Sequence, residues 1–233
     1  MRAVIFDLDG TLIESPTDIK GMKKSLIDYA VKLGLERENL STEQTTVDIV
    51  KAIYNYLVQN GFSKSFIETS LRRLNETMDK FEIENVDSVK AVEGARETLR
   101  EIKSLGLKTG ILTRSCRAYC EKALEITGMR ELVDAIEPRR NLLTAKPNPA
   151  SLLNLCSRMK VKPNEVVFFG DHTLDLECAS RAGVPFVGIS DKPERRRSLR
   201  KGGCKLILRK ISDVIQVIKR GFREPLEPPT SSL

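Results

Sequence analysis

The sequence lacks the features that mark membrane-spanning and secreted proteins. Its 233 residues include no tryptophan, one histidine and only 5% aromatic residues. No apolar run approaches the roughly 20 residues that a membrane-spanning helix needs. Residues 1–7 lack the apolar stretch of a signal peptide and lead into an acidic cluster. We therefore expect a soluble, cytoplasmic protein without a membrane partner.

Cysteine is present, but in no pattern that indicates disulfides or zinc. The cysteines are Cys116, Cys120, Cys156, Cys178 and Cys204. An odd number at scattered positions argues against a disulfide framework. A zinc site would need more ligands than Cys116 and Cys120 supply, and His172 is the only histidine. We expect five reduced, mostly buried cysteines.

The net charge of +7 is unevenly distributed along the chain. Residues 1–90 carry a net charge of −3 and residues 91–233 a net charge of +10. A basic half can attract anionic substrates, nucleic acid among them. A solvated, charge-rich surface is the commoner explanation, and no nucleic-acid-binding motif accompanies the charge. We expect no nucleic-acid partner, and we interpret the basic segment 192–223 as a solvated helix or, alternatively, as a site for an acidic partner.

The pattern of apolar residues predicts alternating strands and helices. Strands are predicted near 3–6, 108–112, 133–136, 166–169, 184–188 and 205–208. Helices are predicted near 93–105, 116–127, 149–159, 174–182, 193–201 and 211–220. Strands that alternate with helices form a parallel sheet with helices on both faces. The sequence therefore predicts an α/β fold.

A helical segment separates the first predicted strand from the others. Amphipathic helices are predicted near 17–33, 42–60 and 64–83, with Ser41 or Thr42 as the N-cap of the second. The predicted domains are a core of residues 1–15 and 91–222, an insert of residues 16–90, and a tail of residues 223–233. The tail is rich in Pro and Ser, and we predict that it is disordered.

Polar side chains stand at or just beyond the ends of the predicted strands. They are Asp7, Asp9, Thr113, Lys146, Asp171 and Asp175. In open parallel sheets ligands bind outside the carboxyl ends of the strands, so this fold would gather these side chains in one crevice. Singly, Thr113 is better explained as a helix cap and Lys146 as a solvated side chain. Two pairs of aspartates repel each other unless a cation or a proton relieves them, and Mg²⁺ suits oxygen ligands.

These residue types suit phosphoryl transfer, which needs a nucleophile, charge neutralisation and a proton for the leaving oxygen. Asp7 is the candidate nucleophile, forming an aspartyl-phosphate, and Asp9 is the candidate general acid–base. Mg²⁺ held by Asp7 and Asp171 would shield the nucleophile from the phosphate. The candidate phosphate-binding residues are Thr113, Arg114 and Lys146.

Four segments resemble the motifs of the haloacid dehalogenase-like superfamily. They are residues 7–12 (DLDGTL), 111–113 (ILT), 146–149 (KPNP) and 170–175 (GDHTLD). The resemblance covers nearly the whole chain, from residue 3 to 220. It implies a Rossmann-like core with a mobile helical cap inserted after the first motif, and an aspartyl-phosphate mechanism. The Mg²⁺ ligands it implies are Asp7, Asp9 through its main-chain carbonyl, Asp171 and Asp175.

Within the superfamily, residues 7–19 most resemble phosphoglycolate phosphatase-type enzymes, with Glu14 where Asp is more usual. This implies hydrolysis of a small phosphomonoester such as phosphoglycolate. A phosphomutase, a nucleic-acid 3′-phosphatase and a binding module without catalysis are the alternatives. The intact aspartates and Lys146 speak against the last of these. A monomer and a homodimer are both compatible with the sequence.

Some residues depart from the family pattern or have two interpretations. Arg114 stands where Asn is common, and we favour a surface salt bridge over an extra phosphate contact. His172 is either a proton-transfer group or a helix-start residue at the rim of the site. Lys20, Lys23 and Lys24 can meet a substrate carboxylate, although surface charge is the commoner explanation.

Overall fold

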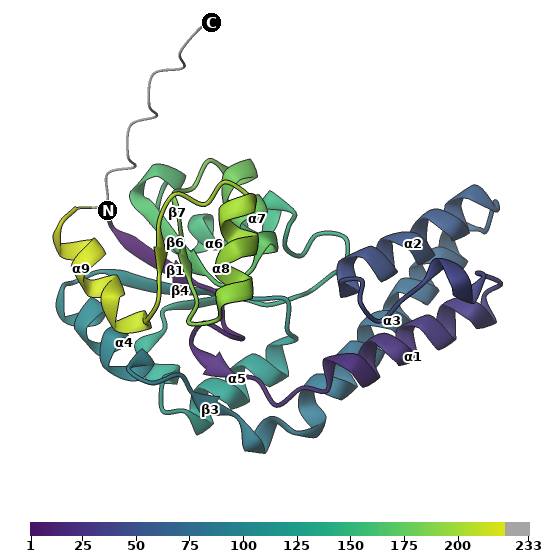
Figure 1. Cartoon of the computed structure of the whole chain (residues 1–233), viewed down its shortest axis with the longest axis horizontal. Helices are drawn as coiled ribbons and strands as arrows, with labels where there is room; N and C mark the ends of the chain where they lie inside the picture. Colours follow the sequence, from purple (N-terminus) through teal and green to yellow (C-terminus); the bar gives the residue numbers. More distant parts are fainter. Residues whose placement is uncertain (222–233) are drawn as a thin grey trace, which may run out of the picture.

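A parallel β-sheet forms the centre of the computed structural model, which describes residues 1–221 (Figure 1). Its six strands lie in the order β5-β4-β1-β6-β7-β8, and each neighbouring pair is parallel. They are β1 (Ala3–Phe6), β4 (Lys108–Leu112), β5 (Ala135–Glu137), β6 (Val166–Gly170), β7 (Phe186–Ile189) and β8 (Ile207–Leu208).

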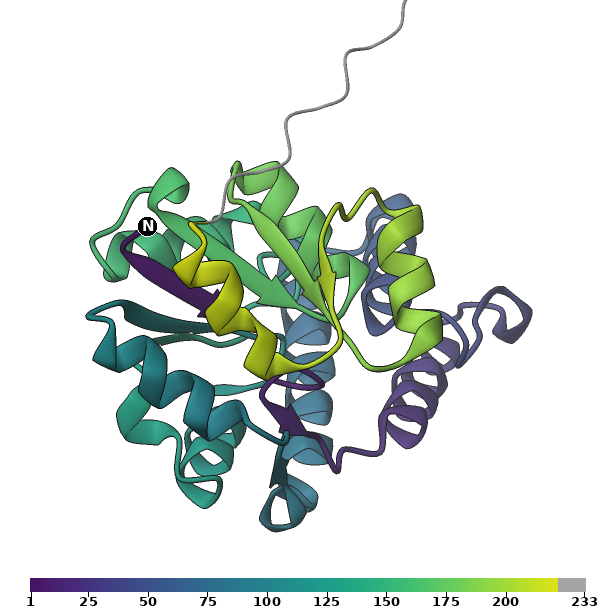
Figure 2. The same cartoon turned by 60° about the vertical axis from the view of Figure 1, so that its left-hand side comes forward.

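Helices cover both faces of the sheet, because its central strands are apolar on both sides. In β1, Val4 and Phe6 face one hydrophobic cluster, and Ala3 and Ile5 face another. The first cluster lies under α4 (Ala95–Ser104), α5 (Arg117–Ile126) and α9 (Val214–Lys219). The second lies under α6 (Pro149–Arg158) and α7 (Thr173–Ala182). Figure 2 shows α9 in front of the sheet, and α8 (Pro193–Lys201) lies beyond β7.

Three helices inserted after β1 form a bundle with its own core. They are α1 (Ile19–Lys32), α2 (Thr46–Gln59) and α3 (Lys64–Glu84), and they project from one side of the sheet (Figure 1). Their apolar faces share one cluster, to which Leu142 of the loop after β5 also belongs. This cap therefore packs on the core as well as on itself.

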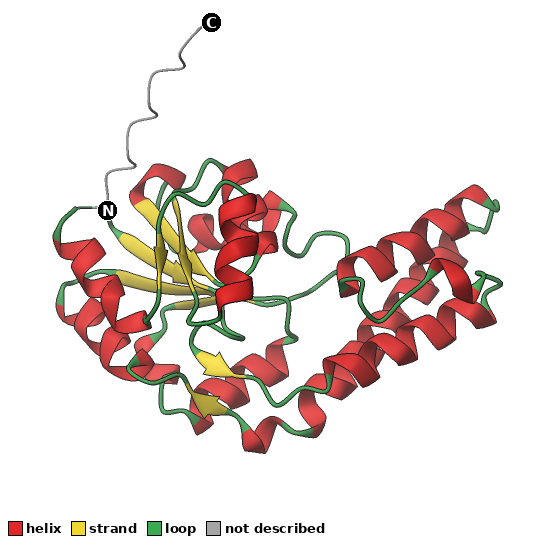
Figure 3. Cartoon of the chain, viewed as in Figure 1, coloured by secondary structure: helices red, strands yellow, loops and turns green. Residues whose placement is uncertain are grey.

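The two chain segments that lead into and out of the cap pair with each other. Strands β2 (Ile13–Glu14) and β3 (Lys90–Ala91) form a small antiparallel sheet, with Ile13 opposite Ala91. Figure 3 shows it apart from the main sheet. The sequence analysis did not predict it, because two residues are too short a run to show a strand period.

The structure confirms the predicted α/β fold with an inserted helical cap, while some local predictions were wrong. Helix α2 begins after Thr45, because Thr45 and Asp48 form a capping box; the predicted caps Ser41 and Thr42 lie in the preceding turn. Short 3-10 helices lie at Arg37–Asn39, Val86–Ser88, Arg130–Leu132, Pro163–Glu165 and Ile211–Asp213. The predicted domain boundaries stay a prediction.

Two further sequence predictions concern burial and the chain end. All five cysteines are free and buried, as predicted. The predicted disordered tail, residues 223–233, lies outside the described residues. Among residues 1–221, no helix has the combination of length and apolarity that a bilayer crossing requires.

The chain order places a topological switch point between β1 and β6. From β1 the chain continues to β4 and β5 on one side, whereas from β6 it continues to β7 and β8 on the other. Phe6 of β1 is level with Ile111 of β4 and Phe169 of β6. The residues that follow these strands therefore meet at one edge of the sheet, where ligands bind in folds of this kind.

Candidate active site

A cavity of about 1020 Å³ lies at this edge, between the core and the cap. Every candidate catalytic, phosphate-binding and metal-binding residue of the sequence analysis lines it: Asp7, Asp9, Thr113, Arg114, Lys146, Asp171 and Asp175. The structure therefore brings together side chains that are far apart in the sequence, as strand ends in a parallel sheet require.

Lys146 lies between two buried carboxylates, those of Asp7 and Asp175. Its Nζ donates to Asp7 Oδ1 at 2.5 Å, to Asp175 Oδ1 at 2.7 Å and to the Leu112 carbonyl at 2.9 Å. Burial acts to lower the pKa of Lys146, but the attraction of Asp175 and Asp7 outweighs it and the pKa lies above its ordinary value. Lys146 is therefore a fixed positive charge, and its interpretation as a solvated side chain is wrong.

Three carboxylates crowd around this lysine. Asp7, Asp171 and Asp175 each present an oxygen within 4.8 Å of the others. Burial raises the pKa of Asp7 well above its ordinary value; Lys146 opposes the rise, and Asp175 and Asp171 add to it. Burial and the neighbouring Asp175 raise the pKa of Asp171 to about 6. The cluster carries more negative charge than one lysine neutralises.

The carboxylate of Asp9 is held by hydroxyl groups from the start of α5. Ser115 Oγ donates to Asp9 Oδ2 at 2.8 Å, and the Tyr119 hydroxyl donates to Asp9 Oδ1 at 2.8 Å. Thr113 Oγ1 lies 3.4 Å from the same Oδ2 and also accepts the Ser115 N–H. Both carboxylate oxygens of Asp9 therefore have fixed partners.

Tyr119 also reaches the chain segment that enters the cap. Its hydroxyl lies 2.9 Å from Ser15 Oγ, which donates in turn to Thr17 Oγ1 at 3.0 Å. The ring is fully buried in the core beneath α5. Asp9 is thus connected to the linker between β2 and α1 through a single rigid side chain.

His172 and Arg114 have structural partners that the sequence could not indicate. His172 is the N-cap of α7: its Nδ1 accepts the Leu174 N–H at 3.1 Å, and its own N–H donates to Asp175. Burial and Arg195 lower the pKa of His172. These contacts support the helix-start interpretation at the rim of the cavity.

The favoured interpretation of Arg114 as a surface salt bridge was wrong. Arg114 is half-buried, and its guanidinium donates to the Lys146 carbonyl. Burial and the nearby Arg139 lower the pKa of Arg114 to about 10. No carboxylate among residues 1–221 lies within ion-pair distance of Arg114. Because Arg114 also lines the cavity, its positive charge is available there.

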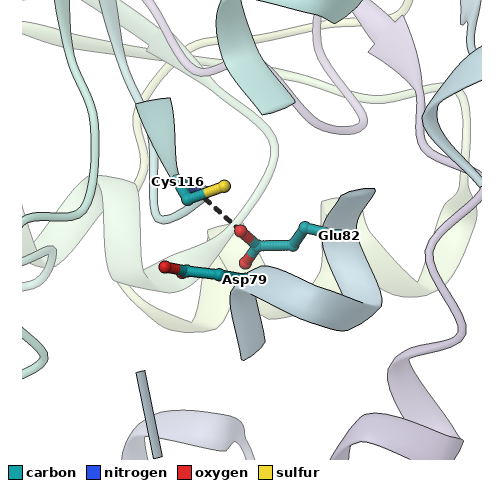
Figure 4. A group of neighbouring side chains, drawn as sticks. All are labelled: Asp79, Glu82 and Cys116. Atoms are coloured by element: carbon teal, nitrogen blue, oxygen red, sulfur yellow. Dashed lines mark hydrogen bonds between the residues drawn. The ribbon is translucent and has the colours of Figure 1, made fainter. Parts of the chain in front are cut away.

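A second acidic group lies where α3 meets the core. Figure 4 shows Asp79 and Glu82 on α3 beside Cys116, with Glu82 accepting the Cys116 main-chain N–H at 2.7 Å. The three side chains are close enough together to hold a metal ion. However, the buried guanidinium of Arg139 pairs with both carboxylates, at 2.6 Å from Glu82. Burial also raises the pKa of the Cys116 thiol to about 11. We therefore assign this group as an ion-pair cluster.

The ion-pair cluster anchors the loop that follows β4. Arg139 donates from its side chain to the Arg114 carbonyl and from its main chain to the Ser115 carbonyl at 3.0 Å. Glu82 binds the next main-chain N–H, that of Cys116. A cap helix and the loop after β5 thus fix the segment that carries Thr113, Arg114 and Ser115.

Comparison with known proteins assigns the family. The model of the haloacid dehalogenase-like hydrolases matches residues 4–189. The chain belongs to the haloacid dehalogenase-like hydrolases. The resemblance drawn from the four motifs is therefore confirmed.

Relatives of this hydrolase cover most of its length. Phosphoglycolate phosphatase of Haemophilus influenzae is 28% identical over 193 residues, 81% of this chain and 85% of the relative. Pyrophosphatase PpaX of Bacillus cereus is 26% identical over 219 residues, 94% and 96% of the two chains. A family hydrolase of Deinococcus radiodurans, solved with bound phosphate and sodium, has a TM-score of 0.61 at 23% identity, with 94% and 96% covered. These matches confirm the predicted enzyme class, a phosphatase of the haloacid dehalogenase-like type.

The donor set of this haloacid dehalogenase-like hydrolase fits a hard divalent cation. Carboxylate oxygens are the ligands that Mg²⁺ prefers. Asp7 and Asp171 present them in the cavity lining, and their side chains are more exposed than that of Asp175. Both oxygens of Asp175 already accept hydrogen bonds, from Lys146 and from the His172 N–H. Burial is the main cause of the raised pKa values of Asp7 and Asp171, and repulsion from the neighbouring carboxylates adds to it; a cation would relieve that repulsion.

Proposed function

We propose that this hydrolase is a Mg²⁺-dependent phosphatase that hydrolyses a small phosphomonoester through an aspartyl-phosphate on Asp7. The observation that carries the proposal is the buried arrangement of Asp7, Lys146 and Asp171 at the switch point, with Asp9 two residues beyond Asp7. The name of the Haemophilus relative and the phosphate in the Deinococcus structure support a phosphate ester as the substrate. Phosphoglycolate is the first compound to test.

The chain's own residues supply a complete reaction cycle. An oxygen of the Asp7 carboxylate attacks phosphorus, the bond from phosphorus to the leaving oxygen breaks, and that oxygen takes a proton from Asp9. Water then attacks phosphorus and gives a proton to Asp9. The bond between phosphorus and the Asp7 oxygen breaks, so inorganic phosphate is released and the Asp7 carboxylate is restored. Ser115 and Tyr119, which hold Asp9, position it for both proton transfers.

The phosphoryl group is bound by fixed positive charge and by donors. Lys146 keeps its charge and lies against the nucleophile, so it offsets negative charge there. Thr113 and Arg114 line the same side of the cavity at the start of α5. Asp7, Asp171 and the main-chain carbonyl of Asp9 would hold Mg²⁺, which when bound shields the nucleophile from the anionic phosphate.

Phosphate release from a panel of small phosphomonoesters tests the proposal. We expect activity that needs Mg²⁺, is lost with chelator, and falls at least ~1,000-fold in Asp7→Asn. Asp87→Asn is the matched control, because Asp87 is an exposed carboxylate outside the cavity lining; its kcat should stay within about twofold of the parent. Mass spectrometry after acid quench should detect phosphate on the peptide that contains Asp7.

Two outcomes contradict the proposal. Full activity in the presence of chelator would exclude the Mg²⁺-dependent step. Transfer of the phosphoryl group to a sugar hydroxyl, with dependence on a sugar bisphosphate, would indicate the alternative that the sequence left open, a phosphomutase.

A further inference from the structure

Four basic side chains line the active-site cavity on the core side. We call them the basic rim: Lys192, Arg195, Arg209 and Lys210. Lys192 and Arg195 lie at the start of α8, beyond β7, while Arg209 and Lys210 follow β8 directly. The rim therefore extends the sheet edge that carries Asp7 and Asp171: Lys192 and Arg195 follow β7, one strand beyond β6, and Arg209 and Lys210 follow β8, two strands beyond it.

The basic rim contacts the buried cluster of Asp7, Lys146, Asp171 and Asp175, but that cluster does not neutralise its charge. Arg195 Nε lies 3.9 Å from Asp171 Oδ2, which fixes the distance between the rim and the site. Within residues 1–221, the side chains of Lys192, Arg209 and Lys210 have no hydrogen bond or ion pair. Three exposed acids line the cavity as well, Glu14, Glu93 and Asp191, and none of them makes an ion pair with the rim. The buried Glu82, which also lines it, pairs with Arg139.

The cavity is larger than one phosphoryl group requires. Its volume of about 1020 Å³ matches sites that enclose a whole small molecule. The needs of the phosphoryl group are met by Lys146, Arg114 and the donors of the loop after β4. Of the cap lysines considered from the sequence, Lys23 lines the cavity and donates to the Thr42 carbonyl, whereas Lys20 and Lys24 are not among the lining residues. Positive charge for the remainder of a substrate therefore comes mainly from the core.

We infer that the basic rim binds a second anionic group, a carboxylate or a second phosphoryl group, on the leaving-group side of the substrate. This inference rests on the proposed phosphatase function and narrows it to small phosphate esters that carry a further negative charge. It also assigns a role to the basic segment that follows Asp191. Specificity then depends on the core strands β7 and β8 as well as on the cap.

A matched pair of substrates, with pyrophosphate as a third compound, tests the inference. 3-Phosphoglycerate and glycerol 3-phosphate are similar in size and differ in one carboxylate, and pyrophosphate supplies a second phosphoryl group. The test variant is Arg209→Gln/Lys210→Gln, which leaves Arg195 and its contact with Asp171 intact. The control variant is Arg197→Gln, an exposed arginine of α8 outside the cavity lining.

We expect the parent to favour 3-phosphoglycerate, with its additional carboxylate, over glycerol 3-phosphate by roughly tenfold or more in kcat/KM, as for a hydrogen bond to a charged group. The rim variant should lose that preference through KM, and Arg197→Gln should keep it. Comparable preference in the rim variant and the parent would overturn the inference. So would phosphate release that is fastest from a 3′-phosphorylated oligonucleotide and falls steeply with salt.

A binding measurement separates this inference from the proposed function. Calorimetry with Mg²⁺ compares inorganic phosphate, pyrophosphate and 3-phosphoglycerate on the parent and the rim variant. Tighter binding of the two larger anions, lost in the rim variant, supports the rim even if no compound is hydrolysed. Turnover of several esters with equal affinity for all three anions would support the phosphatase and refute the rim.

Discussion

Replacement of Arg139 by methionine tests whether the ion-pair cluster at the base of α3 stabilises the fold. The Arg139 side chain has no exposed surface, and Glu82 is 6% exposed in the same pair. Removal of one partner of a buried pair leaves the other charge uncompensated and costs about 3–5 kcal/mol of unfolding free energy. In a chain of this size that corresponds to a fall in Tm of about 6–20 °C.

The same substitution should give a stability loss that depends on pH. Burial raises the pKa of Glu82 in the folded protein, and Arg139 opposes that rise. Without Arg139 the folded-state pKa rises further. A raised carboxyl pKa gives stability that is present at low pH and lost as the pH rises through the folded-state value. The deficit of Arg139→Met should therefore be larger at pH 8 than at pH 5.

Urea unfolding of the parent and the variant at both pH values measures this deficit. Arg117→Met is the control, because Arg117 forms an exposed pair with Glu121 one turn away on α5 and should cost less than about 1 kcal/mol. Arg139→Met/Glu82→Gln should recover part of the loss, since glutamine still accepts the Cys116 N–H without a buried charge. A deficit for Arg139→Met below about 1 kcal/mol, or one equal at both pH values, would refute the reasoning.

Three further perturbations address the catalytic residues. Tyr119→Phe removes one donor to Asp9 and should lower kcat roughly tenfold with little change in KM; an unchanged kcat would exclude a positioning role. Gly10→Ala would place a Cβ 2.7 Å from Asp171 Oδ2 at a φ of +83°, and it should abolish Mg²⁺-dependent activity. Gly61→Ala is the control: its φ of +68° is also positive, but no atom lies within 4 Å of the added Cβ, so activity should be retained. Mg²⁺ at about 100 times its Kd should raise the free energy of unfolding by about 2.7 kcal/mol. This gain should shrink below about pH 6, because burial and Asp175 raise the pKa of Asp171 to about 6. A gain that does not change with pH would argue against Asp171 as a ligand.

The sequence predicted most residues of the candidate active site because they stand at or near the ends of strands in a repeating pattern. Asp7, Thr113 and Asp171 come directly after buried strands of a parallel sheet, and such strand ends meet at one edge. Lys146 follows no described strand directly. The sequence analysis grouped it with the residues just beyond the strand ends, and the resemblance of residues 146–149 to a family motif implies the same placement. The helices of the cap were predicted from their amphipathic period, since a stripe of apolar residues such as that on α3 is a local feature.

The contacts that hold Asp9 and the loop after β4 were not predicted, because they join residues far apart in sequence. Tyr119 is a buried tyrosine on an apolar helix face, and its sequence context does not show where the hydroxyl points. The buried position of Glu82, in contrast, could have been recognised from the sequence. Leu74, Met78 and Glu82 recur every four residues on one buried stripe of α3, so the carboxylate occupies an apolar position and needs a buried partner. Nothing local identifies Arg139 as that partner.

The anchoring of the loop after β4 by α3 sets a limit on how this protein can be recombined. An exchange of residues 16–90 for the cap of another family member would remove Asp79 and Glu82 and leave Arg139 in the core as a bare buried charge. A transplant that succeeds must carry an acidic residue at the position of Glu82 or replace Arg139 as well. The unit that can be inherited or engineered separately is therefore smaller than the inserted segment, and it ends within α3.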